Sequence, residues 1–81
     1  MTTADLNSFL LRSLRRKSPM TEDELTLAAK NVFQGDCKSS DVRERLSDLD
    51  DKGYITSQAS DGITPATHAL TAKGEHKAKT L

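Results

Sequence analysis

Few residues in this chain of 81 could carry out catalysis or bind a metal, and they are not grouped as such sites require. Cys37 is the single cysteine, and no base or second cysteine adjoins it. Because a reactive thiol needs a lowered pKa, we expect a partly buried, inert one. His68 and His76 fall on different expected elements, and no Cys/His/Glu spacing matches a metal site. We expect no metal and no cofactor, with His68 at the surface or edge of a strand.

An acidic run, Asp48, Asp50 and Asp51, could attract a cation or a basic partner. Its spacing is not that of a calcium loop, which needs a twelve-residue pattern with a central glycine. A solvated helix face is the simpler interpretation. The chain also has no glycine-rich phosphate loop and no nucleophile elbow, so we do not expect an enzyme.

Charge is balanced overall but unevenly distributed. Twelve Lys and Arg face twelve Asp and Glu, for a net charge of zero, yet residues 1–20 carry +3, residues 21–53 carry −4 and residues 54–81 carry +1. The basic cluster Arg12, Arg15, Arg16 and Lys17 could contact phosphates or meet an acidic helix of another molecule. A solvated helix end, which the helix dipole favours, is the simpler explanation.

The length fits one domain over residues 1–81. The apolar run at residues 9–11 is far too short for a signal peptide or a membrane span. A lone cysteine cannot form an internal disulfide, which favours a cytoplasmic protein without a membrane partner. A domain this small buries only ~60 % of its unfolded surface, so dimerisation would help it.

Apolar spacings of three and four predict three helices, which must position any site. The first covers residues 5–17, the second runs from Thr21 to Gly35–Asp36, and the third covers residues 40–52. Their expected buried faces are, in order: Leu6, Phe9, Leu10, Leu14 and, widening the face, Leu11; Leu25, Ala28, Ala29, Val32 and Phe33; Val42, Leu46 and Leu49.

Residues that begin and end helices support this assignment. Thr21 and Glu24 form a capping box, and Met20 and Leu25 fall at the positions of a hydrophobic staple. For the third helix we expect Ser39, Ser40 or Asp41 as the cap, with Asp41–Glu44 as a further capping box. Gly53 fits the left-handed position after that helix, and Tyr54 could then pack back on Leu49.

After Gly53 the pattern becomes that of a hairpin. Residues 54–57 predict a strand, Asp61–Gly62 a turn, and residues 68–70 a returning strand that could include Ile63 or Thr67. Pro65 indicates an irregular tip. Thr71 can cap a last helix over residues 72–79, which Gly74 weakens.

Two stretches resemble winged helix-turn-helix domains of the MarR-like and PadR-like regulators. One is Val42-x-x-x-Leu46-x-x-Leu49-x-x-Lys52-Gly53-Tyr54-Ile55, and the other is Leu70-Thr71-Ala72-Lys73-Gly74. The resemblance implies an α+β fold with a three-helix core, a two-stranded β-hairpin wing and a short C-terminal helix. It also implies a third helix in the DNA major groove, a wing on the backbone or minor groove, and often a dimer.

The resemblance makes double-stranded DNA the first expected partner and transcription regulation the expected role. The residues we expect at DNA are Lys38, Ser39, Ser40, Arg43, Ser47, Thr56 and Gln58. Ser57, Ser60 and Thr64 could add polar contacts.

A second hypothesis is a protein-interaction winged helix that does not bind DNA. The outer face of the third helix carries three acids, and residues 54–70 contain no Lys or Arg, whereas DNA affinity comes largely from such cations. The interaction surface would comprise Arg12, Arg15, Arg16, Glu44, Asp48 and Asp51. Leu11 and Leu81, as exposed apolar residues, could join Phe9 in a homodimer face.

Overall fold

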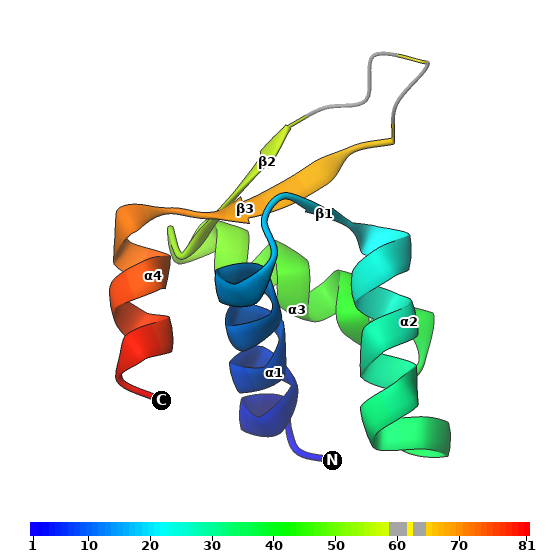
Figure 1. Ribbon diagram of the computed structural model, residues 1–81. Coiled ribbons are helices and arrows are strands. Elements are labelled where there is room, and N and C mark those ends of the chain that lie inside the picture. The colour runs from blue at the N-terminus through cyan, green and yellow to red at the C-terminus, as the bar shows by residue number, and fades with distance from the viewer. Residues whose placement is uncertain (59–61, 63–64) are drawn as a thin grey trace.

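A computed structural model shows four helices and three short strands, and it describes residues 1–58, 62 and 65–81 (Figure 1). The order of three helices, a hairpin and a last helix is confirmed. The elements are α1 (Thr3–Arg16), β1 (Met20–Thr21), α2 (Glu22–Phe33), the 3-10 turn η1 (Gln34–Asp36), α3 (Ser39–Asp51), β2 (Ile55–Gln58), β3 (Thr67–Leu70) and α4 (Ala72–Lys79).

The sheet has three strands where the sequence predicted two. Its order is β1-β3-β2, and both pairings are antiparallel. Strand β1 was missed because it has two residues, one of them the N-cap of α2, which are too few to show an alternating pattern. Met20 pairs with His68, which puts His68 on the central strand, so an edge position for it was wrong. The expected turn at Asp61, and Ser60, Ile63 and Thr64, lie outside the described residues.

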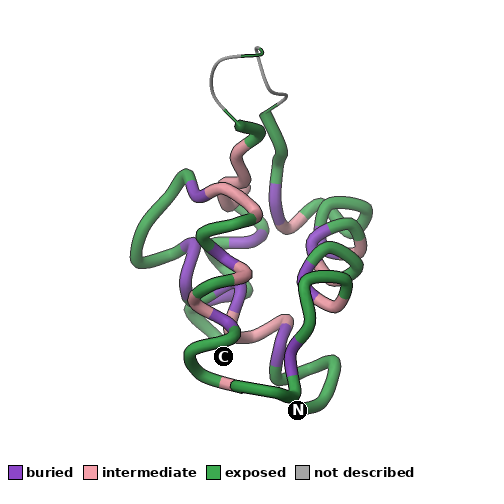
Figure 2. Tube along the Cα trace, turned by 90° about the vertical axis from the view of Figure 1, so that its right-hand side faces the viewer, coloured by how far each residue is buried: buried purple, intermediate pink, exposed green. Residues whose placement is uncertain are grey.

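The core lies where α1, α2 and α3 meet beneath the sheet, and buried and exposed positions alternate around the helices (Figure 2). Leu10, Leu14, Leu25 and Leu49 are at most 2 % exposed. Leu11 is buried as well, so its expected place in an exposed dimer face was wrong. The apolar face of α1 is wide because α4 packs along this helix as well as α3.

The buried face of α2 is narrower than predicted. Leu25 and Ala29 are buried and Ala28 is half-buried, but Val32 is 59 % exposed. Phe33 is half-buried, and its ring meets that of Phe9 edge to face at 5.5 Å between centroids. This contact fixes which side of α2 turns inward and leaves Val32 outside it.

Reciprocal caps start α1 and α2. The predicted Thr21–Glu24 capping box is confirmed, and Thr2 and Asp5 form another that the sequence analysis overlooked. The expected caps of α3 were wrong: Lys38 is the N-cap, and the carboxylate of Asp41 accepts the Lys38 backbone N–H at 3.0 Å. This helix therefore begins one residue earlier than predicted.

One glycine ends α3, and another allows α4 to pack close to the backbone that follows α3. Gly53 has φ +81°, and the Tyr54 N–H donates to the Leu49 carbonyl at 3.0 Å, which confirms the predicted left-handed helix end. The range of α4 is also confirmed, but Gly74 is more than a weak point in it. A Cβ at Gly74 would collide with the carbonyl oxygen of Tyr54, so only glycine allows this close approach.

None of the helices, as far as the structure describes the chain, is long and apolar enough to span a membrane.

Candidate nucleic-acid interface

The outer face of α3 carries most of the residues expected at DNA. Val42, Leu46 and Leu49 hold the helix to the core. Lys38 at the N-cap and, along the helix, Ser39, Ser40, Arg43 and Ser47 are all exposed. The N-terminal half of the helix therefore presents hydroxyl groups and two cationic side chains to solvent.

Arg43 is oriented by the neighbouring helix. Its Nε lies 3.3 Å from Oε1 of Glu22, and its Nη2 lies 3.4 Å from Oε2. The Glu22 carboxylate raises the pKa of Arg43. Because the Arg43 side chain is still 74 % exposed, this forked ion pair positions the guanidinium without covering it.

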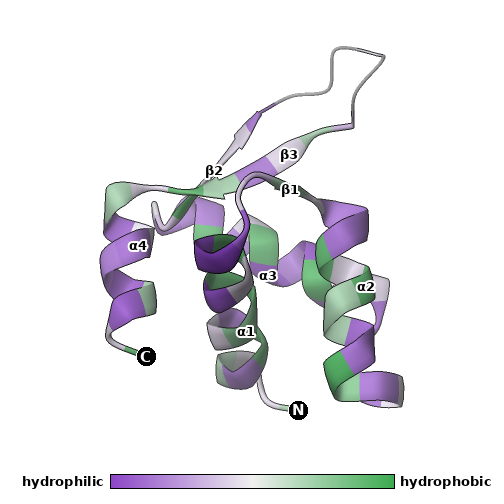
Figure 3. Cartoon of the chain, viewed as in Figure 1, coloured by the Kyte–Doolittle hydropathy of each residue, from purple (hydrophilic) through white to green (hydrophobic). Residues whose placement is uncertain are grey.

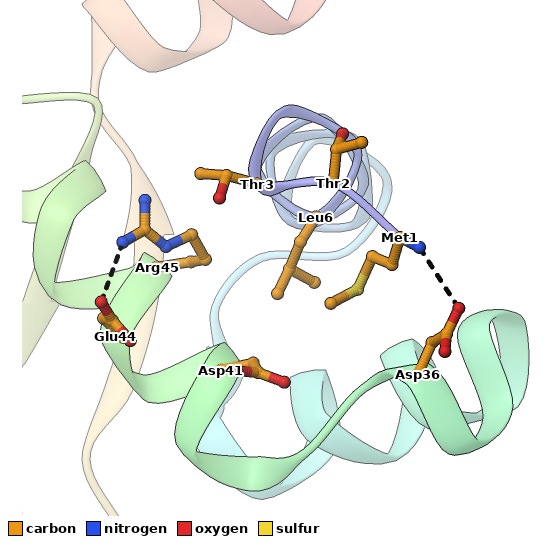
Figure 4. Close-up of a pocket in the computed structure, with 8 residues that line it drawn as sticks. All are labelled: Met1, Thr2, Thr3, Leu6, Asp36, Asp41, Glu44 and Arg45. Atoms are coloured by element: carbon orange, nitrogen blue, oxygen red, sulfur yellow. Dashed lines mark hydrogen bonds and ion pairs between the residues drawn. The ribbon is translucent and has the colours of Figure 1, made fainter.

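Two acids on α3 are paired with cations from the same helix and its end. The Arg45 guanidinium lies 3.3 Å from Glu44 and 3.6 Å from Asp48 (Figure 4 shows the pair with Glu44). The Lys52 ammonium lies 3.0 Å from Asp48. Asp51 has no ion pair within the described part of the chain. The acidic character that the sequence assigned to this face is therefore largely confined to its C-terminal end.

The base of the hairpin is tied to α3 through a polar chain. The Ser57 hydroxyl donates to the Asp50 carboxylate at 3.1 Å and lies 2.9 Å from Nδ1 of His68. Ser57 therefore faces α3. Since side chains alternate along a strand, Thr56 and Gln58 face the other side of the sheet, beside Pro19.

The expected residues thus form two groups rather than one. Those on α3 share one face, whereas Thr56 and Gln58 lie on the sheet face turned away from that helix. Sequence alternation could have separated Ser57 from its two neighbours, but only the contact with Asp50 shows which face meets α3.

The surface expected for the alternative hypothesis is also divided. Arg12, Arg15 and Arg16 are exposed on α1, while Glu44, half-buried Asp48 and Asp51 lie on α3. The arginines line a hollow with residues of α4, whereas the acids line a separate surface with Ser40, Arg43 and Ser47. The structure therefore places the two sets on different surfaces.

Among the residues that the structure describes, the remaining reactive groups form no site. Cys37 is 3 % exposed, and burial, with a smaller contribution from Asp41, raises the pKa of its thiol. This agrees with an inert cysteine. The α-amino group of Met1 lies 3.2 Å from Asp36, at the shallow pocket drawn in Figure 4. The described residues contain no group of His, Cys, Asp and Glu side chains that could hold a metal ion.

Comparison with known proteins identifies the fold. No protein-family model matches the chain, and a search of curated proteins found no match. Among solved structures, the chain is similar to Bacillus subtilis PadR, crystallised in complex with operator DNA, with a TM-score of 0.66 and 22 % sequence identity. The match covers 90 % of this chain and 44 % of the PadR chain, so this chain spans less than half of that protein. The fold is therefore the predicted winged helix-turn-helix.

Proposed function

We propose that this protein binds double-stranded DNA as a regulator of transcription. The observation that carries the proposal is the outer face of α3, which exposes Lys38, Ser39, Ser40 and Arg43 toward its N-terminal end and Ser47 just past its middle. Recognition helices of the helix-turn-helix class contact base edges mainly through their N-terminal residues. Arginine suits guanine and phosphate, and serine hydroxyls can bond to either base edges or backbone.

The similarity to PadR supports this use of the helix. PadR was crystallised with its operator, and nine-tenths of the present chain superposes on that protein's fold. Because one fold can serve several functions, the similarity alone does not assign DNA binding, and the side chains on α3 must supply the argument.

The pairing of charges removes much of the objection to DNA. Glu44 and Asp48 are matched by Arg45 and Lys52, so the unpaired acids that a phosphate backbone would meet on α3 are Asp50 and Asp51 at its C-terminal end, away from Lys38 and Arg43. The interaction-only alternative is correspondingly weaker, because it rests on an uncompensated acidic face.

We further propose that the protein acts in the cytoplasm as a dimer on two half-sites. Helix-turn-helix dimers place their recognition helices about 34 Å apart, one turn of B-DNA. Thr56 and Gln58 would then make secondary contacts from the wing, and the helix residues would make the primary ones.

The ion pair between α2 and α3 makes it possible to test whether Arg43 contacts DNA or only stabilises the fold. Arg43→Ala removes a DNA-facing cation, and Glu22→Gln leaves that cation in place and removes the carboxylate that competes for it. Both changes break the same exposed ion pair, which is worth at most about 1 kcal/mol, so their effects on stability should match. Fluorescence anisotropy with a labelled duplex at low salt measures the two affinities.

We expect Arg43→Ala to weaken DNA binding about tenfold, equivalent to about 1.4 kcal/mol. Glu22→Gln should leave the affinity unchanged or raise it slightly. Equal losses in both variants would show that the ion pair matters only for structure. No effect of Arg43→Ala on measurable DNA binding would remove α3 from the interface.

A further inference from the structure

A second surface lies between α1 and α4, away from the DNA-facing side of α3. These two helices run antiparallel and in contact (Figure 1), and a hollow of about 640 Å³ lies over them. Apolar groups contribute to its lining: the half-buried Phe9 ring, Ala78, and Leu81, which is 42 % exposed.

Cations surround these apolar groups. Arg12, Arg15, Arg16 and Lys79 line the hollow, and no acidic side chain does. The last turn of α1 is among the most hydrophilic parts of the chain (Figure 3). The three arginines have no ion pair or side-chain hydrogen bond within the described residues, and the Lys79 ammonium lies 3.8 Å from its nearest carboxylate, Glu75. Three guanidinium groups are thus unpaired beside an apolar floor.

The helix dipole does not account for this combination. It favours cations at the C-terminal end of α1, but it gives no reason for an apolar hollow beside them. DNA contacts made by α3 do not account for them either, because no residue of α3 lines the hollow.

We propose that the hollow between α1 and α4 docks an acidic amphipathic helix of a protein partner. The apolar side of such a helix would cover Phe9, Ala78 and Leu81. Its flanking carboxylates would pair with the arginines, which bind carboxylates in a forked geometry. Docking of an amphipathic helix in a groove is a general mode of recognition, with apolar anchors spaced by three or four residues.

The charges disfavour the other occupants. A symmetric pair of copies meeting through this surface would set arginines against arginines. The acidic face of α3 from a second copy is a poor match, because Arg45 and Lys52 already compensate two of its acids. A second DNA duplex would satisfy the arginines but would leave the apolar floor uncovered.

The experiment uses the 81-residue protein and a defined probe. The probe is a synthetic helical peptide with leucines on one face and glutamates on both flanks, and its control has lysine in place of each glutamate. Titration calorimetry measures binding, and ¹⁵N chemical shifts locate the bound peptide. The groove variant is Arg12→Glu/Arg15→Glu. Its charge-matched control is Lys30→Glu/Lys77→Glu, which changes two exposed cations that neither line the hollow nor belong to the proposed DNA face.

We expect the acidic peptide to bind and to shift the amides of Phe9, Ala78 and Leu81, and the basic peptide not to bind. The groove variant should lose at least about tenfold in peptide affinity, while the matched control keeps it. DNA binding by the groove variant should fall no further than that of the charge-matched control, so this proposal and the proposed function can fail separately.

Three results would overturn the proposal. One is the absence of acidic-peptide binding at millimolar concentration, and another is equal binding of the two peptides. The third is concentration-dependent self-association in sedimentation that Arg12→Glu/Arg15→Glu abolishes, because the occupant would then be a second copy of this chain.

Discussion

The outer faces of α3 and α1 both carry several charges, but they differ in whether those charges are paired. On α3, Arg43, Arg45 and Lys52 all lie within 4 Å of a carboxylate. On α1, the three exposed arginines have no such partner among the described residues. A count of charges along the sequence therefore shows neither that Glu44 and Asp48 are paired on α3 nor that the arginines of α1 have no carboxylate partner.

Pairing also has a functional consequence. An arginine held by a carboxylate, as Arg43 is by Glu22, is oriented before its target arrives and must exchange one anion for another. An unpaired arginine loses more side-chain freedom on binding but has no competitor. The α3 face thus suits a geometrically fixed target such as a DNA groove, and the α1 face suits a partner that brings its own carboxylates.

The largest expected effect concerns the core that both faces share. Leu10→Ala should lower the free energy of unfolding by about 2–5 kcal/mol, because Leu10 is fully buried and its loss leaves a cavity. Leu27→Ala, at a site 65 % exposed, should change it by no more than about 0.5 kcal/mol. Urea denaturation measures both. Similar small effects would mean that α1 is not packed as described.

The next effect tests the seating of α4 beside α1. Gly74→Ala should destabilise the fold by about 1–3 kcal/mol, since the added methyl group collides with the Tyr54 carbonyl and forces the backbone to shift. Gly35→Ala is the matched control, because a Cβ there meets nothing within 4 Å. Thermal unfolding compares them. A Gly74→Ala protein as stable as the control would contradict the close approach.

A smaller effect, on DNA affinity, tests whether a charge on α3 matters more than the same charge on another helix. Asp51→Asn removes the acid of α3 that has neither an ion pair nor a side-chain hydrogen bond among the described residues, so DNA affinity should rise about two- to threefold through reduced repulsion of phosphate. Glu75→Gln makes the same charge change on α4 and should leave DNA affinity unaltered. Anisotropy titrations distinguish the two. Equal gains would indicate a general charge effect rather than a DNA-facing α3.

The smallest effect concerns the caps that begin α1 and α2. Backbone hydrogen bonds from Thr2 and Thr21 lower the pKa of Asp5 and of Glu24 below their ordinary values of 3.8 and 4.5. A lowered folded-state pKa contributes stability above the unfolded-state value that is lost as the pH falls through the folded-state one. The urea concentration at the midpoint of unfolding should therefore fall as the pH is lowered below 4.5. It should fall less in the variant Asp5→Asn/Glu24→Gln, which lacks both carboxylates. If Asp5→Asn/Glu24→Gln lost as much stability on acidification as the unmodified protein does, the two capping boxes would not be the source of the acid dependence.

Much of the fold was predictable from local chemistry. The Thr21–Glu24 box, the Gly53 helix end and the limits of α4 each depend on neighbouring residues, and all three were predicted correctly. Leu11 and Val32 were misplaced because their burial depends on which helices pack beside them, and the sequence does not give that information. Strand β1 was missed because its pairing with β3 joins residues nearly fifty positions apart.

The candidate interface was less accessible to sequence analysis. Helical periodicity identified the outward residues of α3, but the pairs that neutralise Glu44 and Asp48 depend on side-chain conformations. The ion pair between Glu22 and Arg43 joins two helices, so no pattern of neighbouring residues in the sequence predicts it. The hollow between α1 and α4 likewise exists only once the C-terminal helix is packed on the first.

Salt dependence of DNA binding by the unmodified protein tests the central claim most directly. Anisotropy titrations with a random duplex at about 50 and 200 mM salt compare the two affinities. We predict micromolar binding at low salt and a loss of roughly 10- to 100-fold at high salt, as expected for about three phosphate contacts. An absence of binding at low salt, where even weak phosphate contacts are measurable, would contradict a DNA-facing α3.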